Sequence, residues 1–197
     1  MKKLVVMASG RGSNFATILD YIAKGEINGK VTALIVDKAC GAEKIARENN
    51  IPVFKLKDKE FSQELIEILN KVSPHYILLA GFMRILKKEV VDCYKNKIIN
   101  IHPSLLPAFP GLNAIHQALD YGVKVTGCTV HFVDNKLDHG PIIAQEAVTI
   151  AESDCVKSLL VKIQQKEHKL YPQVVKLLCK DKITIKNRTV YVKEETS

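Results

Sequence analysis

The sequence predicts an α/β fold, with a doubly wound, mostly parallel open sheet and an antiparallel extension at the C-terminus. Two observations support this class. In the first half of the chain, short apolar runs rich in Val, Ile and Leu alternate with amphipathic segments, and the connections between them are short. Alternating strands and helices of this kind form parallel sheets with right-handed crossovers. Hydrophobic residues make up 47% of the 197 residues, enough to bury a sizeable core.

The first 102 residues contain five expected strands with helices between them. Apolar residues at helical spacing identify the helices, as where Phe61, Leu65 and Leu69 fall on one face. Apolar runs bounded by turn residues identify the strands. We expect strands at 3–9, 31–37, 51–56, 76–81 and 97–102, and helices at 14–27, 42–50, 60–72 and 87–96.

After residue 107 the pattern changes to one typical of antiparallel strands. The expected elements are a Pro/Gly loop at 107–111, a helix at 113–122, strands at 127–134 and 141–150, a long helix at 153–179 with a bend at Pro172, and a terminal hairpin at 183–193. Because no linker interrupts this order, we expect residues 1–197 to form a single domain.

The composition favours small anionic ligands. The formal net charge is +8 and the pI is about 9.2, which attracts molecules that carry phosphate or carboxylate. Nucleic acid is not expected, because the lysines are scattered and aromatic residues are only 6%, with no Trp for bases to stack on. No membrane span is expected, because no stretch approaches the roughly 20 apolar residues that one requires.

The five cysteines indicate a reducing compartment. They are widely spaced, odd in number and contain no C-x-x-C pair, which argues against a disulfide framework and a zinc knuckle. The apolar run behind the N-terminal lysines is shorter than that of a secretory signal peptide. We therefore expect a cytoplasmic protein.

The segment ASGRGSN, residues 8–14, joins the first strand to the first helix. Gly12, Ser13 and Asn14 stand where backbone N–H groups at a helix start can bind a phosphate. A simple turn that needs positive φ is the plainer interpretation. A dinucleotide site with Asp37 as ribose acceptor is another, although Phe15 replaces the third glycine of that motif.

The segment LLAGFMRILKKE, residues 78–89, is apolar where a loop after a strand should be polar. One interpretation is a helix start packed on the sheet. The other is an apolar slot for a flat heterocycle, with backbone groups available for hydrogen bonds.

The segment IINIHPSLLP, residues 98–107, begins as a buried strand and ends with two prolines. Asn100 and His102 are alternate residues of the strand, so their side chains point to the same side. They also lie near its carboxyl end, where open parallel sheets bind ligands. An amide donor beside an imidazole can stabilise an oxyanion while a proton moves, so this pair is a candidate catalytic site.

The hairpin loop DNKLDHGP, residues 134–141, supplies carboxylates that could orient and charge that imidazole. Asp134 and Asp138 are the candidates, and an ordinary turn is the plainer interpretation. No metal site is expected, since His131 and His139 belong to no close group of metal ligands. A serine nucleophile is not favoured either, because G-x-S-x-G is absent.

Five segments together carry a family resemblance over nearly the whole chain: GRGSN, LAGFMRIL, NIHPSLLPAFPG, GCTVHFVDNKLDHGPII and EHKLYP. In order and spacing they resemble the glycinamide ribonucleotide formyltransferase family. The resemblance implies a Rossmann-like formyltransferase fold. It also implies formyl transfer from the co-substrate 10-formyltetrahydrofolate to the amine of a phosphoribosyl glycinamide, with no metal. The partners are then two small molecules, and the protein is expected to be a monomer or a homodimer.

The resemblance also implies roles for individual residues. It assigns the phosphate cradle to Gly12, Ser13 and Asn14, the folate slot to Met83, Arg84, Ile85 and Leu86, catalysis to Asn100, His102 and Asp138, and contact with the glycinamide to Glu167. Residues 133–138 would line the other side of the folate slot. Lys59 stands where the family usually has an arginine near the folate, and Asn113 stands where some members have a histidine.

Other functions remain open on the sequence. Two other folate formyl enzymes, methionyl-tRNA formyltransferase and formyltetrahydrofolate hydrolase, are alternatives. Both are expected to be longer chains with an additional domain. A nicotinamide-dependent oxidoreductase could be built on the glycine loop, but the third glycine is missing. A non-catalytic nucleotide-binding module would bind a phosphoribosyl ligand without folate turnover.

Overall fold

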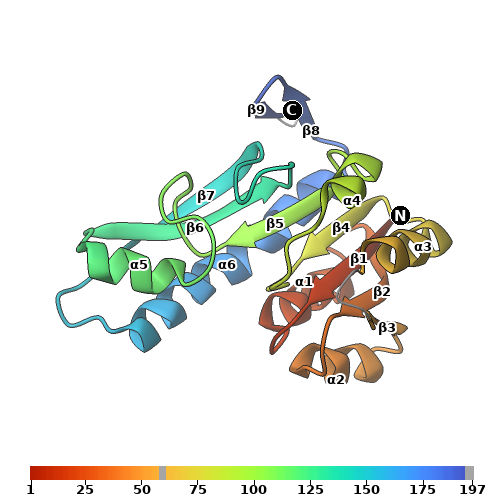
Figure 1. The fold of residues 1–197 in the computed structure, drawn as a ribbon, viewed down its shortest axis with the longest axis horizontal. Coiled ribbons are helices and arrows are strands. Elements are labelled where there is room, and N and C mark those ends of the chain that lie inside the picture. The colour runs from red at the N-terminus through yellow and green to blue at the C-terminus, as the bar shows by residue number, and fades with distance from the viewer. Residues whose placement is uncertain (58–60, 194–197) are drawn as a thin grey trace.

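The structure, a computed structural model, describes residues 1–57 and 61–193. Seven strands of the described residues form one sheet in the order β3-β2-β1-β4-β5-β6-β7 (Figure 1). The strands are β1 (Lys2–Ala8), β2 (Gly29–Val36), β3 (Val53–Lys55), β4 (Tyr76–Leu79), β5 (Ile98–His102), β6 (Val125–Phe132) and β7 (Ile142–Thr149). The first five run parallel, whereas β6 and β7 are antiparallel.

Helices cover both faces of this sheet. They are α1 (Ser13–Ala23), α2 (Gly41–Glu48), α3 (Ser62–Val72), α4 (Lys88–Cys93), α5 (Ala114–Tyr121) and α6 (Val156–Cys179). Two further strands, β8 (Ile183–Lys186) and β9 (Thr189–Val192), form a separate hairpin near the C-terminus (Figure 1). The prediction of a doubly wound, mostly parallel sheet with a C-terminal antiparallel extension is confirmed.

The buried strand β1 shows why two layers of helices are needed. Its side chains alternate between faces, so Leu4 and Val6 join the core beneath α1, α2 and α6. Val5 and Met7 join the core beneath α3 and α4. All four are fully buried. A strand that is apolar on both faces requires this arrangement.

The long helix α6 is anchored to the middle of the sheet. It runs for 24 residues and continues through Pro172. The buried hydroxyl of Tyr171 lies 3.1 Å from the Leu79 carbonyl oxygen and 3.0 Å from that of Ile99. These contacts tie α6 to β4 and β5, the strands that lead to the candidate site.

Some expected boundaries differ from those in the structure. The helix expected at 87–96 is shorter, since α4 ends at Cys93 and the chain turns through Asn96 at a positive φ to enter β5. The helix expected at 153–179 begins at Val156, because Ala151 and Asp154 form a hydrogen-bonded turn before it. Within the described residues, no helix is both long and apolar enough to cross a membrane.

Candidate active site

The end of β5 carries two polar side chains that the sequence singles out, Asn100 and His102. A cavity of about 320 Å³ opens beside them. Four segments line it: those around residues 81–86, 100–103, 111–114 and 131–138. The strand order reverses between β1 and β4, and ligands in doubly wound sheets bind near such a switch point.

The loop after β6 folds back over β5 and brings Asp138 to this pair. His102 Nδ1 lies 3.4 Å from Asp138 Oδ2, and Asn100 Nδ2 lies 3.5 Å from Asp138 Oδ1. The backbone N–H of Gly111 donates to Asp138 Oδ2 at 2.7 Å. The structure thus brings together an amide, an imidazole and a carboxylate from two distant segments, as the sequence predicts.

The imidazole of His102 is buried between two oxygen acceptors. Its Nε2 lies 2.9 Å from the carbonyl oxygen of Phe109, and its Nδ1 faces Asp138. The doubly protonated ring is the form that donates to both oxygens at once. Both ring nitrogens of His102 thus face oxygen atoms beside the cavity.

His131 fixes the amide of Asn100, a role that the sequence reasoning misses. Its Nδ1 lies 2.8 Å from the carbonyl oxygen of Phe132, so Nδ1 carries the proton. Its Nε2 then accepts a hydrogen bond from Asn100 Nδ2 at 3.2 Å. Burial lowers the pKa of His131, which favours this neutral form. One N–H of Asn100 is thus occupied, and the second makes the long 3.5 Å hydrogen bond to Asp138 Oδ1, which a ligand oxygen beside the cavity could replace.

The segment after β4 is a loop that lines the cavity, which excludes the interpretation of it as a helix start. Met83 and Ile85 are 60% and 70% exposed, so an apolar surface faces solvent beside buried polar groups. The N–H of Met83 donates to the Ser9 hydroxyl at 2.9 Å, which joins this loop to the one after β1. Arg84 lies over the Phe61 ring, with its guanidinium carbon 3.9 Å from the ring centroid. Leu86 completes the cavity wall.

The loop between β1 and α1 requires a glycine at position 12. Gly12 precedes α1 at a φ of 83°, and a Cβ there would lie 2.9 Å from the Cα of Ala42. Helix α1 begins at Ser13, and no side chain of the described residues caps its N-terminus. Its first N–H groups are therefore available to an anion.

Behind this loop, Asn14 and Glu167 form a buried polar pair between α1 and α6. Asn14 Nδ2 donates to Glu167 Oε2 at 2.9 Å. The amide oxygen of Asn14 has no hydrogen-bond partner in the described part of the chain. Burial raises the pKa of Glu167 to about 7, although the hydrogen bond from Asn14 opposes the rise. A buried carboxyl group with a pKa shifted this far is a candidate for contact with a ligand.

A family model described as formyl transferase matches residues 2–175. The chain belongs to the formyl transferase family. A phosphoribosylglycinamide formyltransferase of Bacillus subtilis (strain 168) is 44% identical over 186 residues, which cover 90% of this chain and 95% of that protein. Among solved structures, glycinamide ribonucleotide transformylase 1 from Symbiobacterium toebii has a TM-score of 0.95 at 39% identity, covering 98% of this chain and 95% of that one.

The formyl transferase fold also occurs in a protein with a different name. A formyltetrahydrofolate deformylase from Pseudomonas syringae pv. tomato str. DC3000 has a TM-score of 0.91 at 26% identity, and the match covers 67% of that chain. The fold alone therefore does not separate formyl transfer from hydrolysis, and the residues of the site must decide.

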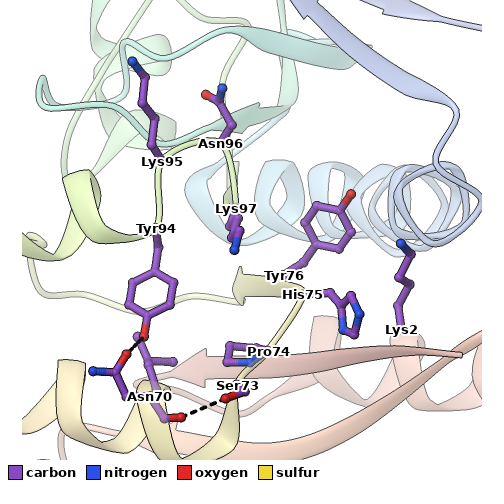
Figure 2. Close-up of a pocket in the computed structure, with 11 residues that line it drawn as sticks. Lys2, Asn70, Ser73, Pro74, His75, Tyr76, Tyr94, Lys95, Asn96 and Lys97 are labelled. Carbon is purple, nitrogen blue, oxygen red and sulfur yellow. Dashed lines mark hydrogen bonds between the residues drawn. The ribbon is translucent and has the colours of Figure 1, made fainter.

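A larger cavity, of about 690 Å³, lies at the opposite end of the parallel strands of this formyl transferase (Figure 2). Lys2, Tyr76 and Lys97, at the amino ends of β1, β4 and β5, line it. Figure 2 shows the Tyr94 hydroxyl bonded to Asn70 at the other side of this cavity. None of the predicted site residues lines it. The predicted folate and catalytic residues line the smaller cavity, whereas the predicted phosphate and glycinamide residues, Gly12, Ser13, Asn14 and Glu167, line neither of the two.

Two further residues that the family resemblance singles out are Lys59 and Asn113. Lys59 lies outside the described residues. Asn113 lines the smaller cavity at a φ of 60°, immediately before α5. Within residues 1–57 and 61–193, no group of three or more His, Cys, Asp or Glu side chains is arranged to hold a metal ion.

Proposed function

We propose that this protein transfers the formyl group of 10-formyltetrahydrofolate to the glycinamide amine of N1-(5-phosphoribosyl)glycinamide, a step of purine biosynthesis. The observation that carries the proposal is the convergence of Asn100, His102 and Asp138 beside one cavity. It occurs in a chain 44% identical to a bacterial phosphoribosylglycinamide formyltransferase. The products are the N-formyl glycinamide and tetrahydrofolate.

The two substrates would approach this trio from different sides. The pterin of the folate fits the cavity, between the wall formed by 83–86 and the loop at 133–138. The phosphate fits the glycine loop, where Gly12, Ser13 and Asn14 open α1. The contact between Ser9 and Met83 supports this joint placement, because it holds the two loops side by side.

The buried pair behind the glycine loop suits the glycinamide. The carboxyl group of Glu167 and the unpaired amide oxygen of Asn14 both accept hydrogen bonds. The N–H groups of a glycinamide would donate to the Glu167 carboxyl group.

The reaction moves one formyl group and one proton. The glycinamide nitrogen attacks the formyl carbon, and the electrons of the C=O bond move to oxygen, which gives a tetrahedral species with an O⁻. When this species collapses, the bond between carbon and N10 of the folate breaks. The proton lost by the attacking nitrogen ends on N10, and tetrahydrofolate leaves.

Each member of the trio has a separate part in this scheme. The second N–H of Asn100 donates to the developing O⁻, while His131 holds the amide in place. The imidazolium of His102 stabilises the same negative charge. Asp138 orients that ring and balances its charge in a buried position.

The decisive experiment is one assay with purified protein. The folate absorbance should change only when 10-formyltetrahydrofolate and the phosphoribosyl glycinamide are both present. Formate release without the glycinamide would identify a hydrolase instead. Binding of the phosphoribosyl ligand without folate turnover would identify a nucleotide-binding module, and a fluorescence change on titration with NAD(H) would point to an oxidoreductase.

We further propose a cytoplasmic location, a single domain over residues 1–197, and a monomer or homodimer. The odd number and wide spacing of the five cysteines support a reducing compartment. A single sheet that includes β1 to β7 supports the single domain. Light scattering at working concentration would distinguish monomer from dimer.

A further inference from the structure

The loop that carries Asp138 is held from outside by side chains that belong to neither substrate site. Near its start, Asn135 Nδ2 donates to Asp92 Oδ1, on α4, at 2.9 Å. Near its end, the guanidinium of Arg188, in the turn of the β8–β9 hairpin, donates to the carbonyl oxygen of His139. The C-terminal hairpin thus contacts the loop one residue beyond the candidate catalytic carboxylate.

Arg188 contacts the side chain of His139 as well as its backbone. Its Nη1 lies 3.2 Å from His139 Nδ1 and 3.4 Å from His139 Nε2. His139 Nδ1 in turn lies 2.8 Å from Asp134 Oδ2, across the loop. The hairpin thus contacts a residue whose side chain already links the two ends of the loop.

The backbone at this point determines where the Asp138 carboxylate lies. Asp138 has a φ of 46°, a conformation that non-glycine residues rarely adopt without support. On the far side, Gly140 packs so tightly on β6 that a Cβ would lie 1.8 Å from the Phe132 carbonyl oxygen. The peptide that follows His139 is therefore held between β6 and the hairpin.

We propose that Arg188, in the C-terminal hairpin, is a positioning residue for the formyl transfer. By fixing the His139 peptide, it holds Asp138 at its place against His102. The inference rests on the proposed function. Arg188 and His139 are both exposed, so their contact contributes little to overall stability. A small misplacement of a reacting group, in contrast, costs much of the rate.

The test compares Arg188→Ala, Arg188→Lys and Lys186→Ala. Lys186 lies on the same hairpin, over the Tyr191 ring, so its removal takes the same charge from the hairpin. We expect Arg188→Ala to lower kcat about tenfold and to raise the KM for the folate, whose cavity this loop lines. The KM for the phosphoribosyl glycinamide should stay unchanged, since its proposed binding loop lies between β1 and α1 and does not include the loop that Arg188 contacts. Arg188→Lys, which still donates to the carbonyl, should recover part of kcat.

A purely structural contact would give a different result. Arg188→Ala would then match Lys186→Ala in kcat and in both KM values, or would lose activity only in proportion to unfolded protein; either outcome overturns the proposal. Hydrogen exchange of residues 133–139 supplies a readout that does not depend on activity. Faster exchange in Arg188→Ala together with the lower kcat supports the proposal, whichever formyl acceptor the enzyme uses. Faster exchange at an unchanged kcat marks a purely structural contact and overturns it, and unchanged exchange refutes it.

Discussion

At the scale of single residues, the Asp138 carboxylate holds three groups in place at once. It faces the imidazole of His102 and the amide of Asn100, and it accepts a hydrogen bond from the backbone of Gly111. The three partners come from two segments of the chain, so one side chain aligns the strand end with the loop before α5. Its negative charge is what a neutral isostere cannot supply.

Asp138→Asn tests that charge. An amide in this position keeps the volume of the side chain but no longer balances an imidazolium, so turnover should fall about 10²- to 10³-fold. Steady-state kinetics at saturating substrates measures the loss, and circular dichroism should show an unchanged fold. Asp120→Asn, the same change on the exposed side of α5, should leave kcat as it is. Near-normal turnover in Asp138→Asn would remove Asp138 from the mechanism.

Asn100→Ala tests the oxyanion donor. Removal of one such donor typically costs about 10²- to 10³-fold in turnover, and the loss should appear in kcat more than in either KM. The variant should still fold, because His131 lies within the sheet and keeps its bond to the Phe132 carbonyl. A variant that loses only affinity for the folate would show that Asn100 binds the substrate without acting on the transition state.

The sequence predicts these three reacting groups because each lies at a recognisable chain position. The groups that orient them are harder to find. His131 acts on Asn100 only through the pairing of β5 with β6, and sequence alternation does not give that register. The Phe109 carbonyl and the Gly111 N–H are backbone groups of a loop, and every residue type carries them. Such contacts depend on the path of the backbone rather than on residue identity.

At the scale of whole elements, α6 and the sheet hold the site together from behind. Most expected strands and helices occur where their apolar periodicity indicates them. The errors lie at the ends, as at α4 and α6, where local turns compete with helix formation. The contact of Tyr171 with β4 and β5 could not be predicted, because a tyrosine on the apolar face of a helix gives no sign of its partner.

Tyr171→Phe tests the link between α6 and the sheet. It removes a fully buried hydroxyl that lies within hydrogen-bond distance of two strand carbonyls, so the free energy of unfolding should fall by about 1–2 kcal/mol. Urea denaturation measures this change, and kcat should stay within about twofold. Tyr121→Phe is the matched control, since that residue is 79% exposed. Equal stability of the two variants would mean that the hydroxyl contacts contribute nothing.

At the scale of the whole molecule, Glu167 makes stability depend on pH. Burial raises its pKa from 4.5 to about 7, so the folded protein keeps a proton that the unfolded chain loses at lower pH. Between these two values the folded state binds more protons, and stability therefore falls as the pH rises. The loss of stability caused by the buried charge on Glu167 is absent below about pH 4.5 and complete above about pH 7. At about 1.4 kcal/mol for each pH unit, it amounts to about 3 kcal/mol.

Glu167→Gln removes this dependence, because the amide has no charge to bury. The variant should therefore be more stable than the wild type at pH 8, by up to about 3 kcal/mol, and the difference should shrink towards zero at pH 5. Chemical denaturation of both proteins at the two pH values measures it. Glu152→Gln, at an exposed position, should follow the wild type at both. A difference that is the same at pH 5 and pH 8 would show that Glu167 titrates as an ordinary carboxyl group. The buried pair with Asn14 would then have no electrostatic cost for a substrate to relieve.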